Sequence, residues 1–163
     1  MENQKIRDTY FKLERNVLIL IAIPLPFFGF AYLLTNSNTV DLDLPELPKF
    51  LDSFGLGLMI AVLFFHYVDF HASVKRILKG EFTLEQKVDL YAKATMKRFW
   101  ALFFSALLGA AGLLFFQNPG FTIALAVNLV FFSLGKPSPD RIVRLLKLKG
   151  EEKTEVEGLK FRG

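Results

Sequence analysis

The chain contains no cysteine, and only two of its 163 residues are histidine. The lack of cysteine excludes disulfides, thiolate metal sites, iron–sulfur clusters and cysteine nucleophiles. His66 and His71 lie five residues apart, about 140° around a helix, so they cannot bind one metal ion together. The sequence also lacks a glycine-rich phosphate loop, an HExxH pattern and a serine–histidine–aspartate context. We therefore expect neither an enzyme nor a bound cofactor or metal ion.

Lysine and arginine are absent from four apolar segments, at residues 17–34, 54–71, 99–116 and 119–135. Hydrophobic residues make up 52% of the chain, and they are gathered in these segments instead of alternating at the period of a soluble core. Each segment is close in length to the roughly 20-residue helix that a bilayer core requires. The sequence therefore predicts an all-α integral membrane protein with four spans.

The turn Gln-Asn-Pro-Gly at 117–120 joins the third and fourth segments. So short a connection forces two helices to be antiparallel neighbours. With the first two segments as the other pair, we expect a four-helix bundle made of two transmembrane hairpins. Pro24 and Pro26 should kink the first span, because a proline removes a backbone donor and its ring clashes with the preceding turn.

The basic residues are distributed unevenly among the connecting segments. Four lysines or arginines precede the first span, seven fall in the loop 72–98 and eight follow the fourth span, whereas Lys49 alone lies in the first loop. Positively charged loops tend to stay on the cytoplasmic side of a membrane. We therefore predict a multi-pass protein of the cell (inner) membrane, with both termini and the loop 72–98 in the cytoplasm.

Local patterns predict the elements that precede and connect the spans in residues 1–135. Residues 1–16 form an amphipathic lead-in that should lie on the membrane surface. Lys79 and Gly80 predict a helix end, with Gly80 in the left-handed conformation. Thr83 and Gln86 form a capping box, which should begin the next helix.

Residues 136–163 are expected to hold a basic amphipathic surface helix and a tail. Ser138 as the capping residue and Pro139 at the first position should start the helix. The charged tail after Glu151 is expected to be loose. The basic side chains expected to contact anionic lipid headgroups are Arg141, Arg144, Lys147 and Lys149.

Three spans each carry one polar residue at a similar depth. His66, Ser105 and Asn128 lie roughly 9–10 Å inside the cytoplasmic helix ends, and Asp69 lies one turn closer to the cytoplasm. Polar residues inside a membrane commonly mark function, so this polar layer is a candidate site for a proton or a small solute. The alternative is that the serine and the asparagine are ordinary interhelical hydrogen-bonding groups and that Asp69 is interfacial.

Small residues recur every three or four positions on the third and fourth spans and would let helices approach closely. Because the turn at 117–120 already makes these spans neighbours, their mutual contact is the expected use. The residues of these helix-packing stripes are Ala101, Ser105, Gly109, Gly112, Gly120 and Ala124.

Two Lys-Gly-Glu triplets, at 79–81 and 149–151, follow the second and the fourth span. They suggest an internal duplication in which each half contains two spans and flanking helices. Motifs this short also recur by chance, so both interpretations stay open.

The sequence favours a non-catalytic membrane protein, namely an accessory, assembly or scaffold subunit whose basic helices contact lipid and partner proteins. The alternative is an oligomeric small-solute or proton transporter or channel that uses the polar layer around His66. The expected partners are a bilayer with anionic headgroups and either further copies of the chain or a larger membrane complex. Nucleic acid is not expected, because membrane topology accounts for the positions of the basic residues.

Overall fold

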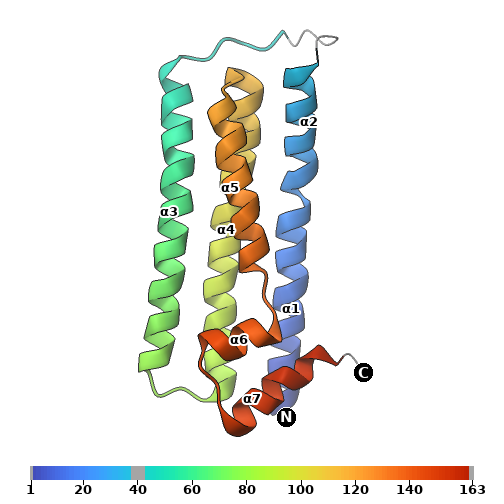
Figure 1. Cartoon of the computed structure of the whole chain (residues 1–163), viewed down its shortest axis with the longest axis vertical. Helices are drawn as coiled ribbons and strands as arrows, with labels where there is room; N and C mark the ends of the chain where they lie inside the picture. Colours follow the sequence, from blue (N-terminus) through green and yellow to red (C-terminus); the bar gives the residue numbers. More distant parts are fainter. Residues whose placement is uncertain (1, 38–42, 162–163) are drawn as a thin grey trace.

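The computed structural model describes residues 2–37 and 43–161, and helices are the regular elements of these ranges (Figure 1). The predicted all-α class is thereby confirmed. Predictions that fall on residues 1, 38–42 and 162–163, in the lead-in, the first loop and the tail, lie outside the described residues. The first five helices of the described chain are α1 Glu2–Ala22, α2 Pro24–Asn36, α3 Phe50–Lys79, α4 Leu84–Phe116 and α5 Pro119–Gly135. They are followed by α6 Pro139–Leu145, α7 Gly150–Glu157 and the 3-10 helix η1 Gly158–Lys160.

Within the described residues, three helical stretches are long and apolar enough to cross a membrane. They are Gln4–Asn36, Phe50–Lys79 and Leu84–Phe116, whose apolar windows have mean hydropathies of 2.4, 1.7 and 2.1. α5 has 17 residues, and the chain bends by 88° between α5 and α6. The described chain thus has the helices of a membrane protein, with three spans, or up to four if α5 and α6 are counted as one.

The predicted surface lead-in is instead the first part of a longer helix. α1 runs without a break into the first apolar segment, and Ile6, Tyr10 and Leu13 are buried on the same face as Val17. Their spacing of three and four residues forms one apolar stripe, and α1 packs against α4. The described part of the lead-in is therefore not a distinct surface element, because burying this stripe against α4 keeps it in line with the first apolar segment.

The two prolines of the first segment interrupt the helix at a single residue. α1 ends at Ala22 and α2 begins at Pro24, with Ile23 between them. Pro24 is the first residue of α2, a position where an amide hydrogen would have no partner within the helix. The two helices continue in nearly the same direction (Figure 1), so the predicted kink is slight.

α4 is the centre of the helix packing. It contacts α1, α2, α3 and α5, and α5 also packs against α3. The predicted pair of the third and fourth segments is present as α4 and α5. The first two segments do not form a corresponding packed pair, since α4 lies between α2 and α3 (Figure 1). The connection between α2 and α3 is long enough to pass over the α4–α5 turn, so it does not force its two helices together.

Asn118 fastens the turn between α4 and α5 to α3. Its side-chain oxygen accepts a hydrogen bond of 2.8 Å from the backbone nitrogen of Gly120 and thereby caps the start of α5. Its amide nitrogen donates to both carboxylate oxygens of Asp52 on α3, at 3.0 and 3.1 Å. One asparagine therefore holds three helices together at this end of the bundle.

The connection between α3 and α4 contains the predicted capping box. The Thr83 hydroxyl accepts from the Gln86 backbone nitrogen at 3.4 Å, and the Gln86 side chain accepts from the Thr83 nitrogen at 3.1 Å. α3 ends at Lys79 as predicted, but Gly80 is extended (φ −86°, ψ 155°) and not left-handed. A Cβ atom at residue 80 would lie 2.1 Å from the Phe82 ring, so any other residue there would require that ring to move.

Residues 139–160 contain α6, α7 and η1, which we call the C-terminal cap. The cap lies across the same end of the bundle as the N-terminus of α1 (Figure 1). The Ser138 hydroxyl accepts from the Arg141 backbone nitrogen at 3.2 Å, so α6 has its predicted start. The predicted basic helix is only seven residues long, however, because the chain leaves the helix and turns at Lys147 (φ 51°).

The tail after Glu151 is not loose within the described residues. Val156 and Leu159 are buried in the same apolar core as α1 and α4. Lys87 of α4 forms an ion pair of 2.9 Å with Glu152 of α7. These contacts dock a segment whose charged composition had predicted disorder.

An ion pair also joins the two ends of the cap. Lys160 of η1 lies 2.5 Å from the Asp140 carboxylate of α6. This hydrogen bond raises the pKa of Lys160 above its ordinary value. Both side chains are largely exposed, so the pair adds little to stability.

Candidate functional site

His66, the centre of the predicted polar layer, is buried where α3 packs against α5. Its side chain is 5% exposed. Nδ1 lies 3.0 Å from the carbonyl oxygen of Val62, and the ring packs edge-on against Phe131 of α5 with the centroids 4.7 Å apart. Nδ1 therefore donates to Val62, and Nε2 has no hydrogen-bond partner among the described residues.

Ser105 and Asn128 are buried on α4 and α5. The amide nitrogen of Asn128 donates to the Leu102 carbonyl oxygen at 3.0 Å, one turn along α4 from Ser105. This hydrogen bond fastens the two helices to each other. The Oδ1 atom of Asn128 and the Oγ atom of Ser105 have no hydrogen-bond partner in the part of the chain that the structure describes.

These three predicted residues lie at a similar height but do not form one hydrogen-bonded site. Asn128 meets α4 one turn from Ser105, and His66 meets Phe131, which is one turn from Asn128 on α5. Among the described residues, no hydrogen bond joins any two of the three. The histidine ring packs against Phe131 and makes no hydrogen bond with Asn128.

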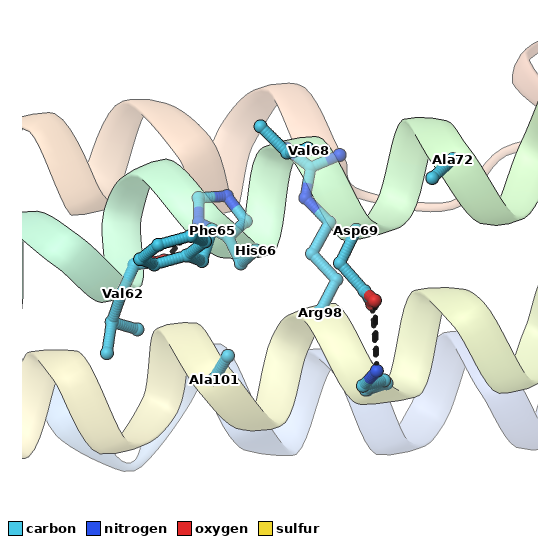
Figure 2. Close-up of a pocket in the computed structure, with 9 residues that line it drawn as sticks. Val62, Phe65, His66, Val68, Asp69, Ala72, Arg98 and Ala101 are labelled. Carbon is cyan, nitrogen blue, oxygen red and sulfur yellow. Dashed lines mark hydrogen bonds and ion pairs between the residues drawn. The ribbon is translucent and has the colours of Figure 1, made fainter.

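Asp69 lies at a groove between α3 and α4 (Figure 2). It pairs with Lys97 of α4 at 3.0 Å, and both side chains are about half exposed or more. The groove has a volume of about 530 Å³, which is typical of small-ligand pockets. Its polar lining residues are His66, Asp69, Lys97 and Arg98, and its apolar ones are Val62, Phe65, Val68, Ala72 and Ala101.

Arg98, which was not among the predicted site residues, is the most unusual polar group of this region. It is 4% exposed, and its guanidinium carbon lies 4.9 Å from the ring centroid of Phe70 and 6.0 Å from that of Phe131. Within the described chain it has no ion pair, and its Nε atom is buried without a hydrogen-bond partner. A buried cation without a counter-ion is costly, and the two aromatic rings offset only part of that cost.

The spacing of the buried residues on α4 identifies Arg98 as an interior residue. Buried positions recur every three or four residues, at Val88, Tyr91, Thr95, Arg98, Leu102, Ser105 and Gly109. Arg98 belongs to this stripe, whereas Lys97 beside it is exposed. The period therefore places Arg98 inside the bundle, although its charge argues for an exposed position.

The predicted small residues serve several helix contacts, and not only that of α4 with α5. A Cβ atom at Gly109 would lie 2.8 Å from side chains of both α3 and α5, and one at Gly112 would lie 2.3 Å from an aromatic ring of α5. A Cβ atom at Gly120 would lie 2.9 Å from a side chain of α3. Ala124 is buried, whereas Ala101 lines the groove beside α3.

The four residues predicted to contact lipid headgroups do not share one helical face. The guanidinium of Arg141 donates to the Leu134 carbonyl oxygen, where a cation offsets the C-terminal dipole of α5. Arg144 is exposed on α6. Lys147 and Lys149 are exposed in the connection between α6 and α7.

Comparisons of this chain with known protein families, with curated proteins and with solved structures find no match. The interpretation of the site therefore depends on the geometry of this chain. That geometry consists of a groove with a charged end, a buried arginine that has no counter-ion among the described residues, and a docked C-terminal cap.

Proposed function

We propose that this protein is a small polytopic membrane protein with four spans and cytoplasmic termini, and that it acts as a non-catalytic accessory, assembly or scaffold subunit. The docked C-terminal cap is the observation that carries the proposal. The last helices of this short chain form a folded, charged surface at one end of an apolar bundle. Such a surface is suited to holding another protein at the membrane.

The proposed fourth span is α5. It packs along α3 and α4, and its 17 residues give a length of about 25 Å. This is slightly short of the roughly 30 Å bilayer core, a mismatch that membranes accommodate at modest cost. The 88° bend before α6 is consistent with a cap that lies at the membrane surface, on the side that the basic residues assign to the cytoplasm.

The cap combines an apolar anchor with a charged outer surface. Val156 and Leu159 face the core, and side chains of both signs are exposed on the cap, among them Arg144, Glu151 and Lys153. Charged groups of both signs at an interface contribute more to the choice of partner than to affinity. The proposed partner is therefore a protein with complementary charge near the cytoplasmic membrane surface.

Affinity purification from native membranes in a mild detergent, with mass spectrometry of the co-purified chains, tests this role. We expect the natural chain to bring a defined partner with it. Val156→Asp should lose that partner, because it places a carboxylate in the core and detaches the cap. Gln4→Asp adds a carboxylate at an exposed position of α1, outside the cap, and should keep the partner. A natural chain that carries no other protein, even after cross-linking in the membrane, would contradict the proposal.

An oligomeric transporter or channel is the second candidate, and the unpartnered Nε2 atom of His66 favours it. Its weakness is that His66 meets Phe131 instead of the other residues of the polar layer. Proton and solute flux in proteoliposomes distinguishes the two candidates. Flux that disappears in His66→Leu would favour the transporter over the accessory subunit.

A further inference from the structure

The groove between α3 and α4 has an excess of positive charge. Lys97 and Arg98 line it together with a single carboxylate, that of Asp69. Lys97 is the residue that pairs with this carboxylate, so Arg98 is left without a counter-ion in the described chain. An anion in the groove would supply the counter-charge that Arg98 lacks among the described residues.

Two buried polar atoms of the groove have no hydrogen-bond partner among the described residues. They are Nε2 of His66 and Nε of Arg98, in side chains that are only 5% and 4% exposed. Figure 2 shows Arg98 crossing from α4 between His66 and Asp69. Both residues line the groove, so its wall contains polar groups whose hydrogen-bonding capacity is not used.

The polarity of the groove also changes along its length. Asp69, Ala72 and Lys97 lie toward the end of α3 that leads to the α3–α4 connection, whereas Val62 and Ala101 lie toward the middle of the spans. The groove opens on an outer surface with exposed aromatic side chains, at Phe65, Trp100 and Phe104. A polar end followed by apolar walls matches the profile of a phospholipid in the cytoplasmic leaflet.

We propose that the α3–α4 groove binds one anionic phospholipid, with the phosphate at Lys97 and Arg98 and an acyl chain along Val62 and Ala101. Arginine and lysine form short, charge-assisted hydrogen bonds with phosphate oxygens. The glycerol backbone would lie about 4.5 Å deeper, one turn along α3, at the level of His66. There Nε2 accepts from a hydroxyl group or, in the protonated ring, donates to an ester oxygen.

Asp69 favours a lipid over free phosphate. The exposed ion pair of Asp69 with Lys97 is weak, so a phosphate group can compete for the lysine. The carboxylate remains near the site and repels negative charge, which is a greater penalty for doubly charged inorganic phosphate than for a singly charged phosphodiester. The apolar walls contribute further binding energy only to a ligand with an acyl chain.

The inference rests on the membrane placement proposed above and not on the accessory role. The test is native mass spectrometry of the delipidated full-length chain. The chain is titrated with phosphatidylglycerol or with phosphatidylcholine of identical acyl chains, and the binding of the two lipids is compared. We expect preferential binding of phosphatidylglycerol. Lys97→Gln should weaken that binding roughly fivefold, the effect of one basic residue near an anionic headgroup. Lys75→Gln makes the same charge change at an exposed position of α3 outside the groove, and should have no effect.

Ala101→Leu fills the apolar part of the groove without changing charge, and should weaken the binding of both lipids at this site. Equal binding of the two lipids by the natural chain would overturn the inference, as would equal losses in Lys97→Gln and Lys75→Gln. Inorganic phosphate that displaces the lipid at equal concentration would overturn it as well, because the site would then recognise a free anion. A failure of this kind leaves the co-purification of a partner protein unaffected, so the two proposals fail separately.

Discussion

At the scale of single residues, Gly112 allows α5 to approach α4 closely. A Cβ atom at Gly112 would lie 2.3 Å from the ring of Phe121, which is fully buried and stacked on Phe116. We expect Gly112→Ala to lower the free energy of unfolding by about 1–3 kcal/mol, because a ring enclosed on all sides cannot move aside. Denaturation in mixed detergent micelles, followed by the fluorescence of Trp100, measures this change.

Gly57→Ala is the matched control for that substitution. No atom lies within 4 Å of a Cβ position at Gly57, which is exposed on α3. The same change there should leave stability unchanged or raise it slightly through helix propensity. Equal destabilisation by the two substitutions would show that the contact of α4 with α5 is not the cause.

The relative positions of the polar residues along their helices could be predicted, but their neighbours could not. Counting residues along a helix gives relative positions, and the contacts of Asn128 with Leu102 and of His66 with Phe131 keep the three polar residues about one turn apart from one helix to the next. The rotation of one helix against another is set by the packing of all the side chains between them. The contact of His66 with Phe131 depends on this rotation, and no local pattern around either residue indicates it.

At the scale of elements, α7 should depend on its single apolar anchor. Val156 is fully buried, and Val156→Asp places a carboxylate where it has no partner. We expect the segment 147–160 to detach and to be cut by trypsin at least about tenfold faster, since an unpaired buried carboxylate costs more than 1.4 kcal/mol. Limited proteolysis in detergent measures the rate.

Thr154→Asp is the control, because residue 154 is exposed, two residues before the buried Val156. Its cleavage rate should match that of the natural chain. If the two variants were cut equally fast, apolar docking would not be what holds the cap. The ion pair of Lys87 with Glu152 would then be the next contact to remove.

Elements that depend on adjacent residues could be predicted from sequence. The capping box at Thr83 and the start of α6 at Ser138 are both present, because a cap needs only a few neighbouring residues. The docking of the tail could not be predicted in this way. Val156 and Leu159 are two apolar residues in a charged segment, and they show no period that would reveal a buried face.

The two Lys-Gly-Glu triplets also differ once they are placed in the fold. Gly80 follows the last residue of α3 and is extended, whereas Gly150 is the first residue of α7 and has a φ of 54°. The same three residues thus end one helix and begin another. This difference favours chance resemblance over duplication.

At the scale of the whole molecule, the proposed orientation can be tested directly, because the natural chain has no cysteine. Glu46→Cys and Lys153→Cys place single thiols at exposed positions in the first loop and in the cap. A membrane-impermeant maleimide should label the first variant in intact cells and the second only after permeabilisation. Labelling of the cap from outside would reverse the orientation and remove the cytoplasmic role proposed for it.

The arrangement of the helices was only partly predictable at this scale. The turn at 117–120 is so short that α4 and α5 must be neighbours. The longer connection between α2 and α3 permits several arrangements of these two helices. Which arrangement forms depends on the side chains that α4 presents to each of them. Gly109 of α4 admits a close approach of α3, which no pattern in the first two segments indicates.

The central position of α4 has a consequence for biogenesis. α1, α2 and α3 are synthesised before the helix against which they pack. In the proposed membrane topology, the first two apolar segments would enter the bilayer before their common neighbour is complete. A chain that ended in the α3–α4 connection would lack the surface on which these three helices assemble, so we expect the bundle to form only after α4 has been synthesised.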